Sequence, residues 1–229
     1  MKKKKLQDTS EKIFFADNAN FAELFNKFFD LKKEKQDRMI NGALKIFALN
    51  GYQKASTDDI VKEAGISKGL LFHYFGSKAG VYIFVYEYSA RYMAMELQRA
   101  VSLRERDLFC LLSQVEDAKY VLLRNYPYMQ KFLLTHEEIG DAEIRNAIAD
   151  YTGMVSGVMD EIVERADRSR IRDDVDQELL VRSMRYFTRG LMETALTDNM
   201  DPEEAHREAG AYYKMMRDRF TKEAYLKEE

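Results

Sequence analysis

Hydrophobic residues recur along most of the chain at the three- and four-residue spacing of amphipathic helices. In residues 35–50, for example, Ile40, Leu44 and Phe47 form one such stripe. Gly51 follows at a position where a helix can end. No segment alternates with the period of two that half-buried β-strands show. The pattern therefore predicts an all-α protein.

Residues 56–78, with the sequence STDDIVKEAGISKGLLFHYFGSK, predict two short helices joined by a tight turn. Ser56 and Ser67 stand where the two helices would begin and can cap them. Gly65 stands between the helices, where the backbone needs a positive φ. Helices this short are marginal in isolation, so packing must hold them. The predicted arrangement is a helix-turn-helix, in which the second helix lies in the DNA major groove.

The remaining hydrophobic stripes predict a succession of longer helices. Two prolines mark helix starts, namely Pro127 after a helix break and Pro202 after the capping residue Asp201. The stretch that begins at Asp141 is expected to run as one helix to about Arg168. The predicted helices cover residues 77–102, 107–125, 127–139, 141–168, 176–197 and 202–224.

An extra amphipathic helix is expected ahead of residue 35, because Phe21, Leu24 and Phe28 follow helical spacing. The many phenylalanines of this stretch need a surface to pack on, either the rest of this chain or a partner subunit. A lid or a membrane-surface helix is the alternative use. The preceding residues 2–5 are all lysine and form a basic arm that can lie along phosphates or stay a solvated terminus.

The composition of the 229-residue chain fits a helical protein with a core of its own. Only 2 residues are proline, and 46% are hydrophobic. Cys110 is the sole cysteine, which excludes an internal disulfide and favours a small buried hydrophobe over a redox sensor. Neither a signal peptide nor an apolar stretch long enough to span a bilayer is found. We therefore expect a soluble, cytoplasmic protein.

The net charge of −3 argues at first against a nucleic-acid partner, but the distribution of charge changes that conclusion. Residues 1–80 contain 15 Lys and Arg against 10 Asp and Glu, a net charge of +5. The remaining residues therefore carry a net charge of −8. A basic amino-terminal part on an acidic body fits a protein that presents one end to DNA phosphates.

The run GISKGLLFHYF, residues 65–75, followed by Ser77 and Lys78, resembles the DNA-binding domain of the TetR family of transcriptional regulators. The similarity begins near residue 36 and fades after about residue 84. One departure is visible after the serine-lysine pair, where the family usually carries acidic residues and this chain has Ala79 and Gly80. Losing that capping box is expected to weaken the start of the next helix by about 1 kcal/mol.

The resemblance implies an all-α architecture with three parts. Residues 1–34 would be the basic arm and the extra amphipathic helix, and residues 35–80 the three-helix DNA-binding domain. Residues 81–229 would form a larger helical domain for effector binding and dimerisation. Its last two long helices, 176–197 and 202–224, would pair with their copies in a homodimer, although the same stripes could instead serve a core within the chain.

The resemblance also implies which residues meet DNA. Gly69 would let the backbone approach the duplex, and Leu70 could touch a thymine methyl group. Phe72 and Phe75 would face inward and fix the helix. Lysines in this region could also be simple solvated charges. The implied DNA-binding residues are Thr57, Ser67, Lys68, Gly69, Leu70, His73, Tyr74 and Lys78.

The rest of the chain shows no catalytic, metal-binding or cofactor-binding pattern, since its three histidines are far apart and it has no phosphate-binding glycine loop. An enzyme is therefore not expected. The abundance of Tyr, Phe and Met suits a hydrophobic effector cavity, and ordinary core packing is the alternative for each residue. The hypothetical lining residues are Phe109, Tyr120, Tyr128, Phe132, His136, Tyr151, Met154 and Phe187.

Pattern and resemblance together predict a DNA-binding transcriptional regulator, a repressor that a small hydrophobic or aromatic effector releases from a near-palindromic operator. The second helix of the helix-turn-helix has no Arg, Asn or Gln for bidentate base contacts, so phosphate contacts and DNA shape should contribute more than base readout. The alternative is a protein of the same fold that acts as a protein-binding module through the phenylalanine-rich stretch Phe14–Leu31.

Overall fold

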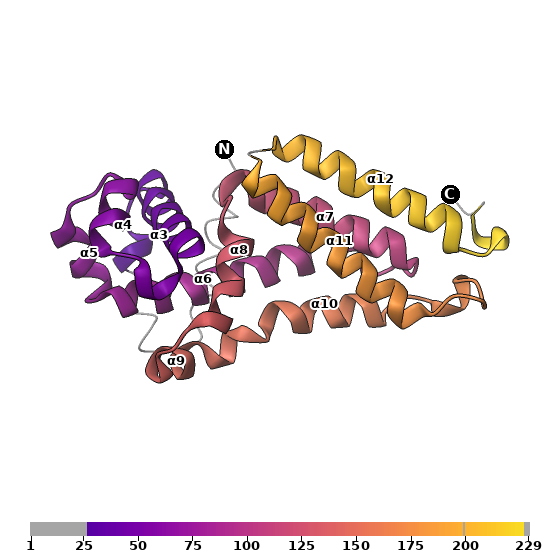
Figure 1. The fold of residues 1–229 in the computed structure, drawn as a ribbon, viewed down its shortest axis with the longest axis horizontal. Helices are drawn as coiled ribbons and strands as arrows, with labels where there is room; N and C mark the ends of the chain where they lie inside the picture. The colour runs from indigo at the N-terminus through magenta and orange to yellow at the C-terminus, as the bar shows by residue number, and fades with distance from the viewer. Residues whose placement is uncertain (1–26, 199, 227–229) are drawn as a thin grey trace. The chain divides into compact units, whose positions relative to one another are not determined.

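The computed structural model describes residues 27–198 and 200–226, which form helices joined by short connections (Figure 1). The predicted all-α fold is confirmed for these residues, whose one isolated antiparallel bridge joins Ile171 to Thr221. The predicted basic arm and most of the predicted amino-terminal helix lie outside the described residues. The elements are α3 Lys33–Lys54, α4 Thr57–Ala64, α5 Lys68–Phe75, α6 Lys78–Ala100, α7 Leu108–Asn125, α8 Met129–Leu134, η1 Thr135–Glu138, α9 Ala142–Thr152, α10 Met154–Glu164, η2 Arg168–Arg170, α11 Gln177–Thr197, α12 Pro202–Phe220 and η3 Glu223–Tyr225.

The chain divides into two compact units. The first unit contains the described residues up to Met95 together with Tyr126–Val155, and so includes α3, α4, α5, most of α6, α8 and α9. The second unit contains Glu96–Asn125 and the residues from Ser156 onward, and so includes α7, most of α10, α11 and α12. The predicted helix-turn-helix lies within the first unit. The functional division of the chain at residues 34 and 80 remains a prediction.

The two short helices of the helix-turn-helix begin after the predicted capping residues, and the first ends at Gly65 as predicted. The Ser56 hydroxyl accepts a hydrogen bond from the Asp59 amide at 3.1 Å, and the Ser67 hydroxyl accepts one from the Leu70 amide at 3.2 Å. Gly65 ends α4 with a φ of 62°, the left-handed region that favours glycine. The predicted caps are therefore confirmed.

The prediction of a single helix over residues 141–168 is wrong. α9 ends at Thr152 and α10 begins at Met154, while residue 168 falls in η2. Gly153 stands at the junction with φ −90° and ψ −5°. Glycine in a helix interior costs about 1 kcal/mol relative to alanine, so Gly153 favours a break here, although Gly157 is accommodated within α10.

Buried tyrosines of α6 form the centre of the first unit. Tyr82, Tyr86 and Tyr88 are at most 1% exposed, so this part of α6 is buried on several sides. Buried hydroxyls need hydrogen-bond partners, and all three find them in the segment 126–135. The pairs are Tyr82 with the Thr135 hydroxyl at 2.8 Å, Tyr86 with the Leu133 carbonyl at 3.2 Å, and Tyr88 with the Tyr126 hydroxyl at 2.9 Å.

A buried ion pair within α6 contacts Tyr151 of α9 inside the first unit. Glu87 is 1% exposed, and its carboxylate accepts a hydrogen bond from the Arg91 Nε at 2.8 Å. The Arg91 guanidinium lies over the Tyr151 ring at 5.4 Å, and Tyr151 also hydrogen-bonds to Glu87. Burial raises the pKa of Glu87 above its usual value, while Tyr151 and Arg91 act in the opposite direction. Arginine and tyrosine thus stabilise a carboxylate that water does not reach.

Hydrophobic side chains of α7, α11 and α12 pack together in the second unit. The buried core includes Leu108 and Phe109 from α7, Leu180 and Met184 from α11, and Tyr213 from α12. None of the described helices is long and apolar enough to cross a membrane.

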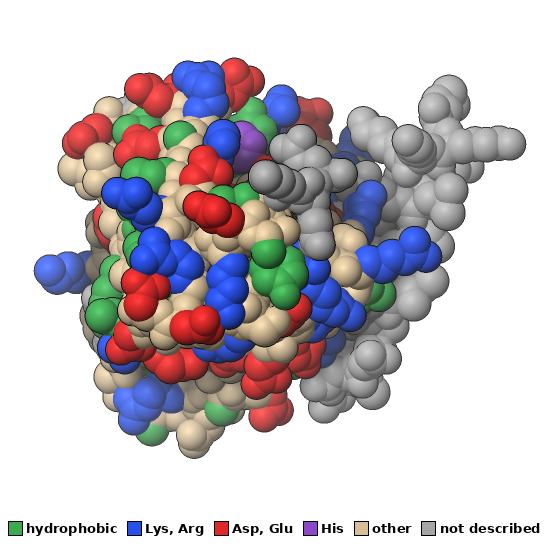
Figure 2. All heavy atoms as spheres, turned by 90° about the vertical axis from the view of Figure 1, so that its right-hand side faces the viewer, with side chains coloured by type: hydrophobic (Ala, Val, Ile, Leu, Met, Phe, Trp, Pro, Cys, Tyr) green, Lys and Arg blue, Asp and Glu red, His purple; other side chains and the backbone are tan. Residues whose placement is uncertain are grey.

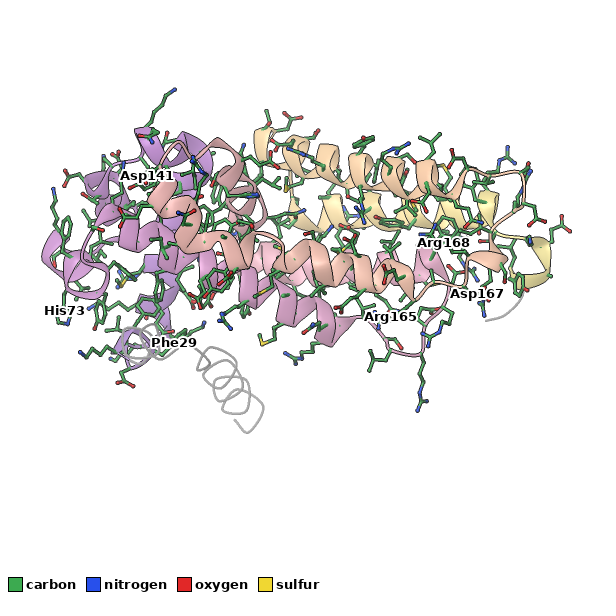
Figure 3. The ribbon with its side chains drawn as sticks, turned by 90° about the horizontal axis from the view of Figure 1, so that it is seen from below. Phe29, His73, Asp141, Arg165, Asp167 and Arg168 are labelled. Carbon is green, nitrogen blue, oxygen red and sulfur yellow. The ribbon has the colours of Figure 1, made fainter. Side chains whose placement is uncertain are left out.

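The end of the second unit that carries η2 and η3 presents acidic and basic side chains side by side, with hydrophobic ones only in small separate groups (Figure 2). Two of its ion pairs are Arg172–Asp174 at 2.6 Å and Lys222–Asp173 at 2.7 Å. Asp167 and Arg168 lie at the same end (Figure 3). Because the two signs alternate, this end does not form the uniformly positive surface that DNA phosphates would need.

Candidate nucleic-acid interface

α4 and α5 are held against α3 by a small, tightly packed core. Ile60 is fully buried, and Ala64 and Leu71 are each 1% exposed. α3 and α4 approach each other closely at Gly42, where an added Cβ would lie 2.9 Å from the Ala64 Cβ. This close approach explains why α3 carries glycine there and keeps α4 in a defined position under α5.

Four side-chain positions of α5 are exposed, namely Lys68, Gly69, Phe72 and His73. Their spacing places them along one side of the helix, because residues three or four positions apart share a helical face and 68–72, 69–72 and 69–73 are so spaced. His73 points away from the rest of the first unit (Figure 3). We call this set the outer face of α5, and it is the surface that a DNA groove would meet.

The expectation that Phe72 faces inward is wrong, because Phe72 is 38% exposed. Leu71 is the buried residue, and Phe75 shares its side of the helix four positions later. Phe72 is one residue beyond Leu71 and therefore points about 100° away from it. The apolar run from Leu70 to Phe72 concealed this orientation in the sequence; counting the helical phase from Leu71 and Phe75 would have revealed it.

Lys68 stands on the outer face in an ion pair with Asp58 of α4, with 2.8 Å between the Nζ and a carboxylate oxygen. Both side chains are more than half exposed. Exposed ion pairs contribute at most about 1 kcal/mol, so a phosphate can compete with Asp58 for the lysine. The structure therefore leaves Lys68 able to meet DNA.

Lys78 is placed differently from Lys68, because its ammonium caps the end of α3. Its Nζ donates hydrogen bonds to the Tyr52 carbonyl at 2.9 Å and the Ala55 carbonyl at 3.1 Å. It also lies 4.4 Å from the centre of the Tyr52 ring. The positive charge of Lys78 thus fastens α6 to the end of α3, a role that the sequence did not indicate.

The remaining predicted DNA residues lie on or beside the helix-turn-helix. Ser67 is exposed and caps α5, whereas Thr57 and Leu70 are half-buried. Tyr74 is also half-buried, with its ring in contact with Phe28, Phe75 and His73. The structure therefore brings the predicted set together around one short helix, with Lys68, Gly69 and His73 fully accessible on it.

The predicted effector residues are divided between the two units. Tyr128, Phe132, His136, Tyr151 and Met154 belong to the first unit. Phe132 is fully buried among aromatic rings, and His136 contacts the Tyr86 ring. The others, Phe109, Tyr120 and Phe187, belong to the second unit.

In the second unit Tyr120 stacks on His206 and Phe187 stacks on Tyr212. These contacts are with neighbouring side chains of the same chain. Among the described residues, no group of three or more His, Cys, Asp or Glu side chains is placed to hold a metal ion.

The sequence of the helix-turn-helix is similar to that of known bacterial regulators. Residues 39–83 match the family described as bacterial regulatory proteins, tetR family. The chain is 43% identical over 56 residues to the uncharacterized HTH-type transcriptional regulator YuxN of Bacillus subtilis, a match that covers 24% of this chain and only 19% of that protein. It is 26% identical over 160 residues to the HTH-type transcriptional repressor AcnR of Corynebacterium efficiens, covering 66% of this chain and 76% of that protein.

Solved structures extend the similarity beyond the helix-turn-helix. The transcriptional regulator FadR from Bacillus subtilis, in complex with stearoyl-CoA, matches with a TM-score of 0.54 and 19% identity. The match covers 77% of this chain and 96% of that chain. At this identity the likeness shows the fold alone. Residues 39–83 thus match the tetR family of bacterial regulatory proteins, and the fold of the chain is similar to that of a solved transcriptional regulator.

Proposed function

We propose that this chain is a transcriptional repressor that binds a near-palindromic operator through α5. The observation that supports the proposal is the outer face of α5, a short helix presented after a tight turn, as DNA-reading helices are. This face offers an ammonium, an imidazole and an aromatic ring. Base contacts would be mainly apolar, such as Phe72 against a thymine methyl group, while phosphates set the orientation of the helix.

We further propose that the protein acts as a homodimer through α11 and α12. Supporting this, the second unit leaves large hydrophobic side chains exposed on both helices, with Leu179 at 51% and Tyr186 at 67% on α11 and Met215 at 57% on α12. Exposed apolar groups on neighbouring helices are typical of protein interfaces. A two-fold dimer would place two copies of α5 about one helical turn of DNA apart or somewhat more, which an inverted repeat matches.

A protein-binding role through the phenylalanine-rich stretch Phe14–Leu31 is less well supported. Phe28 and Phe29, the phenylalanines of that stretch that the structure describes, are 0% and 7% exposed. Both are used in packing within the chain, so they are not available to a partner protein.

Selection of duplexes from a random DNA pool tests the proposal. We expect the wild-type protein to enrich an inverted repeat, with an affinity that falls steeply as salt rises because phosphate contacts release counterions. The variant Phe72→Ala with His73→Ala should lose the enrichment and stay folded, since both side chains are exposed.

The control variant Leu103→Ala removes a residue that is 75% exposed and belongs to the second unit, not to the helix-turn-helix, and should select the same repeat. Recovery of no repeat by a well-folded wild-type dimer, or an affinity insensitive to salt, would contradict operator binding through α5.

We infer that a small hydrophobic or aromatic effector releases the repressor. The supporting observations are the aromatic content of both units and the acyl-CoA ligand of the FadR structure, a protein of similar fold. An effector can act only if it binds the DNA-free and DNA-bound conformations with different affinities. Compounds such as stearoyl-CoA and cationic aromatic molecules should therefore raise the melting temperature and lower operator affinity. Absence of both effects across a broad library would contradict effector control.

A further inference from the structure

Two phenylalanines ahead of α3 pack behind the recognition helix. Phe28 is fully buried, with its ring centre 4.9 Å from that of Phe84 on α6. On α5, the ring of Phe28 lies 5.8 Å from Phe75 and 6.0 Å from Tyr74, centre to centre. Phe28 therefore contacts α5 and α6 at the same time, from the side opposite the outer face of α5.

The backbone of this segment is fastened to α3. Gln36 is 3% exposed, and its side-chain amide donates to the Phe29 carbonyl at 3.1 Å and the Leu31 carbonyl at 2.8 Å. The Leu31 amide closes a turn by donating to the Phe28 carbonyl at 3.1 Å. Phe29 lies in this segment (Figure 3), and its ring packs against Tyr88 of α6 at 6.2 Å. A buried, satisfied amide fixes the place of its partners, so Phe28 has a defined position.

α5 depends on such support because it has few buried contacts of its own. It contains eight residues, and Leu71 is the one that is fully buried. Ring pairs in edge-to-face geometry have a preferred orientation as well as attraction, so they can fix the rotation of a short helix. Phe28 meets both Tyr74 and Phe84 in this geometry, at interplanar angles of 86° and 66°.

We infer that Phe28 is a positioning residue for DNA recognition, which holds α5 in its orientation against α6. Phe28 lies outside residues 39–83, the part of the chain that matches the family, so this support is an addition to the shared domain. The effect of Phe28 on operator affinity rests on the proposed DNA binding. Its effect on the orientation of α5 can be tested in the free protein alone. Phe28 would act through Tyr74 and Phe75, without contact to DNA.

Amide hydrogen exchange in the free, full-length protein tests the inference, with Phe28→Leu as the variant. Leucine keeps the site apolar and removes the ring geometry. We expect exchange in α5 to accelerate about tenfold relative to α3 and α4, and affinity for the selected operator to fall about tenfold with the salt dependence unchanged. A contact with phosphate, in contrast, would change the salt dependence.

The matched control is Phe47→Leu. Phe47 is equally buried in the first unit, and its ring neighbours are Tyr52, Tyr82 and Phe132, none of which belongs to α5. This control should lower the melting temperature without a selective effect on α5. Unchanged exchange in α5 of Phe28→Leu, or acceleration equal in α3, α4 and α5, would overturn the inference. Failure of the wild type to select any DNA would overturn the proposed function instead, and the exchange result would still decide the role of Phe28.

Discussion

Replacing Arg91 by leucine should lower the free energy of unfolding by about 3–5 kcal/mol, the usual effect of removing one partner from a buried ion pair. Arg91 donates to the Glu87 carboxylate at 2.8 Å, and Glu87 is 1% exposed. Without the guanidinium, the carboxylate would keep the hydrogen bond from Tyr151 as its neutral partner. A buried charge with so little compensation is strongly unfavourable.

The loss of stability in Arg91→Leu should grow with pH. Burial already raises the pKa of Glu87 in the folded protein above its usual value of 4.5, and removing the arginine raises it further. The folded state then holds a proton that the unfolded state releases, so stability falls as pH rises. The contribution of Glu87 to this loss of stability is absent at pH values below its pKa in the unfolded protein. It is complete at pH values above its pKa in the folded variant. Urea denaturation at a series of pH values from acid to neutral measures it.

A double variant distinguishes the effect of the unpaired buried charge on stability from the effect of lost side-chain packing. Arg91→Leu with Glu87→Gln removes both charges and keeps a side chain of similar volume that can still bond to Tyr151. It should recover most of the lost stability and lose the added pH dependence. If Arg91→Leu alone is as stable as the wild type across the pH series, the ion pair does not contribute to the stability of the first unit.

Gly80→Ala should destabilise the junction of α5 and α6. An added Cβ at Gly80 would lie 1.9 Å from the Phe75 carbonyl oxygen and 3.1 Å from its carbon, both backbone atoms that cannot rotate away. The turn between α5 and α6 would therefore have to move, at about 1–3 kcal/mol or more. Because Phe75 ends α5, operator affinity should fall together with the melting temperature. Thermal denaturation and DNA titration measure the two effects.

Gly157→Ala is the control for Gly80→Ala. It makes the same substitution in α10, where nothing lies within 4 Å of the added Cβ. There alanine should raise stability by up to about 1 kcal/mol through its higher helix propensity. Equal melting temperatures for Gly80→Ala and wild type would show that the turn accommodates a side chain.

The same glycine accounts for the departure from the family pattern after the serine-lysine pair. An acidic side chain at position 80 would meet the Phe75 carbonyl, and the helix start is capped instead by Ser77, whose hydroxyl accepts from the Gly80 amide at 3.0 Å. The serine half of the capping box is thus present, while the acidic half is absent as predicted.

Features that depend on a few neighbouring residues could be predicted from the sequence. Serine caps at Ser56 and Ser67 and positive φ at Gly51 and Gly65 stand where expected. The reason is local: a cap joins a side chain to an amide three residues away, and a left-handed backbone needs glycine. The helix-turn-helix follows from these features, which is why residues 56–78 were sufficient to predict it.

The roles of side chains that could serve several purposes depend on the packing of the folded chain. Lys78 could have been a phosphate contact, but the carbonyls at the end of α3 lie within its reach, 23 and 26 residues away in sequence. Phe72 and Phe28 are equally hydrophobic, and one is exposed while the other is fully buried. Such roles depend on contacts between segments that are distant in sequence, where burial outweighs local conformational preference. The spacing of residues along the chain does not show which distant segment will pack against them.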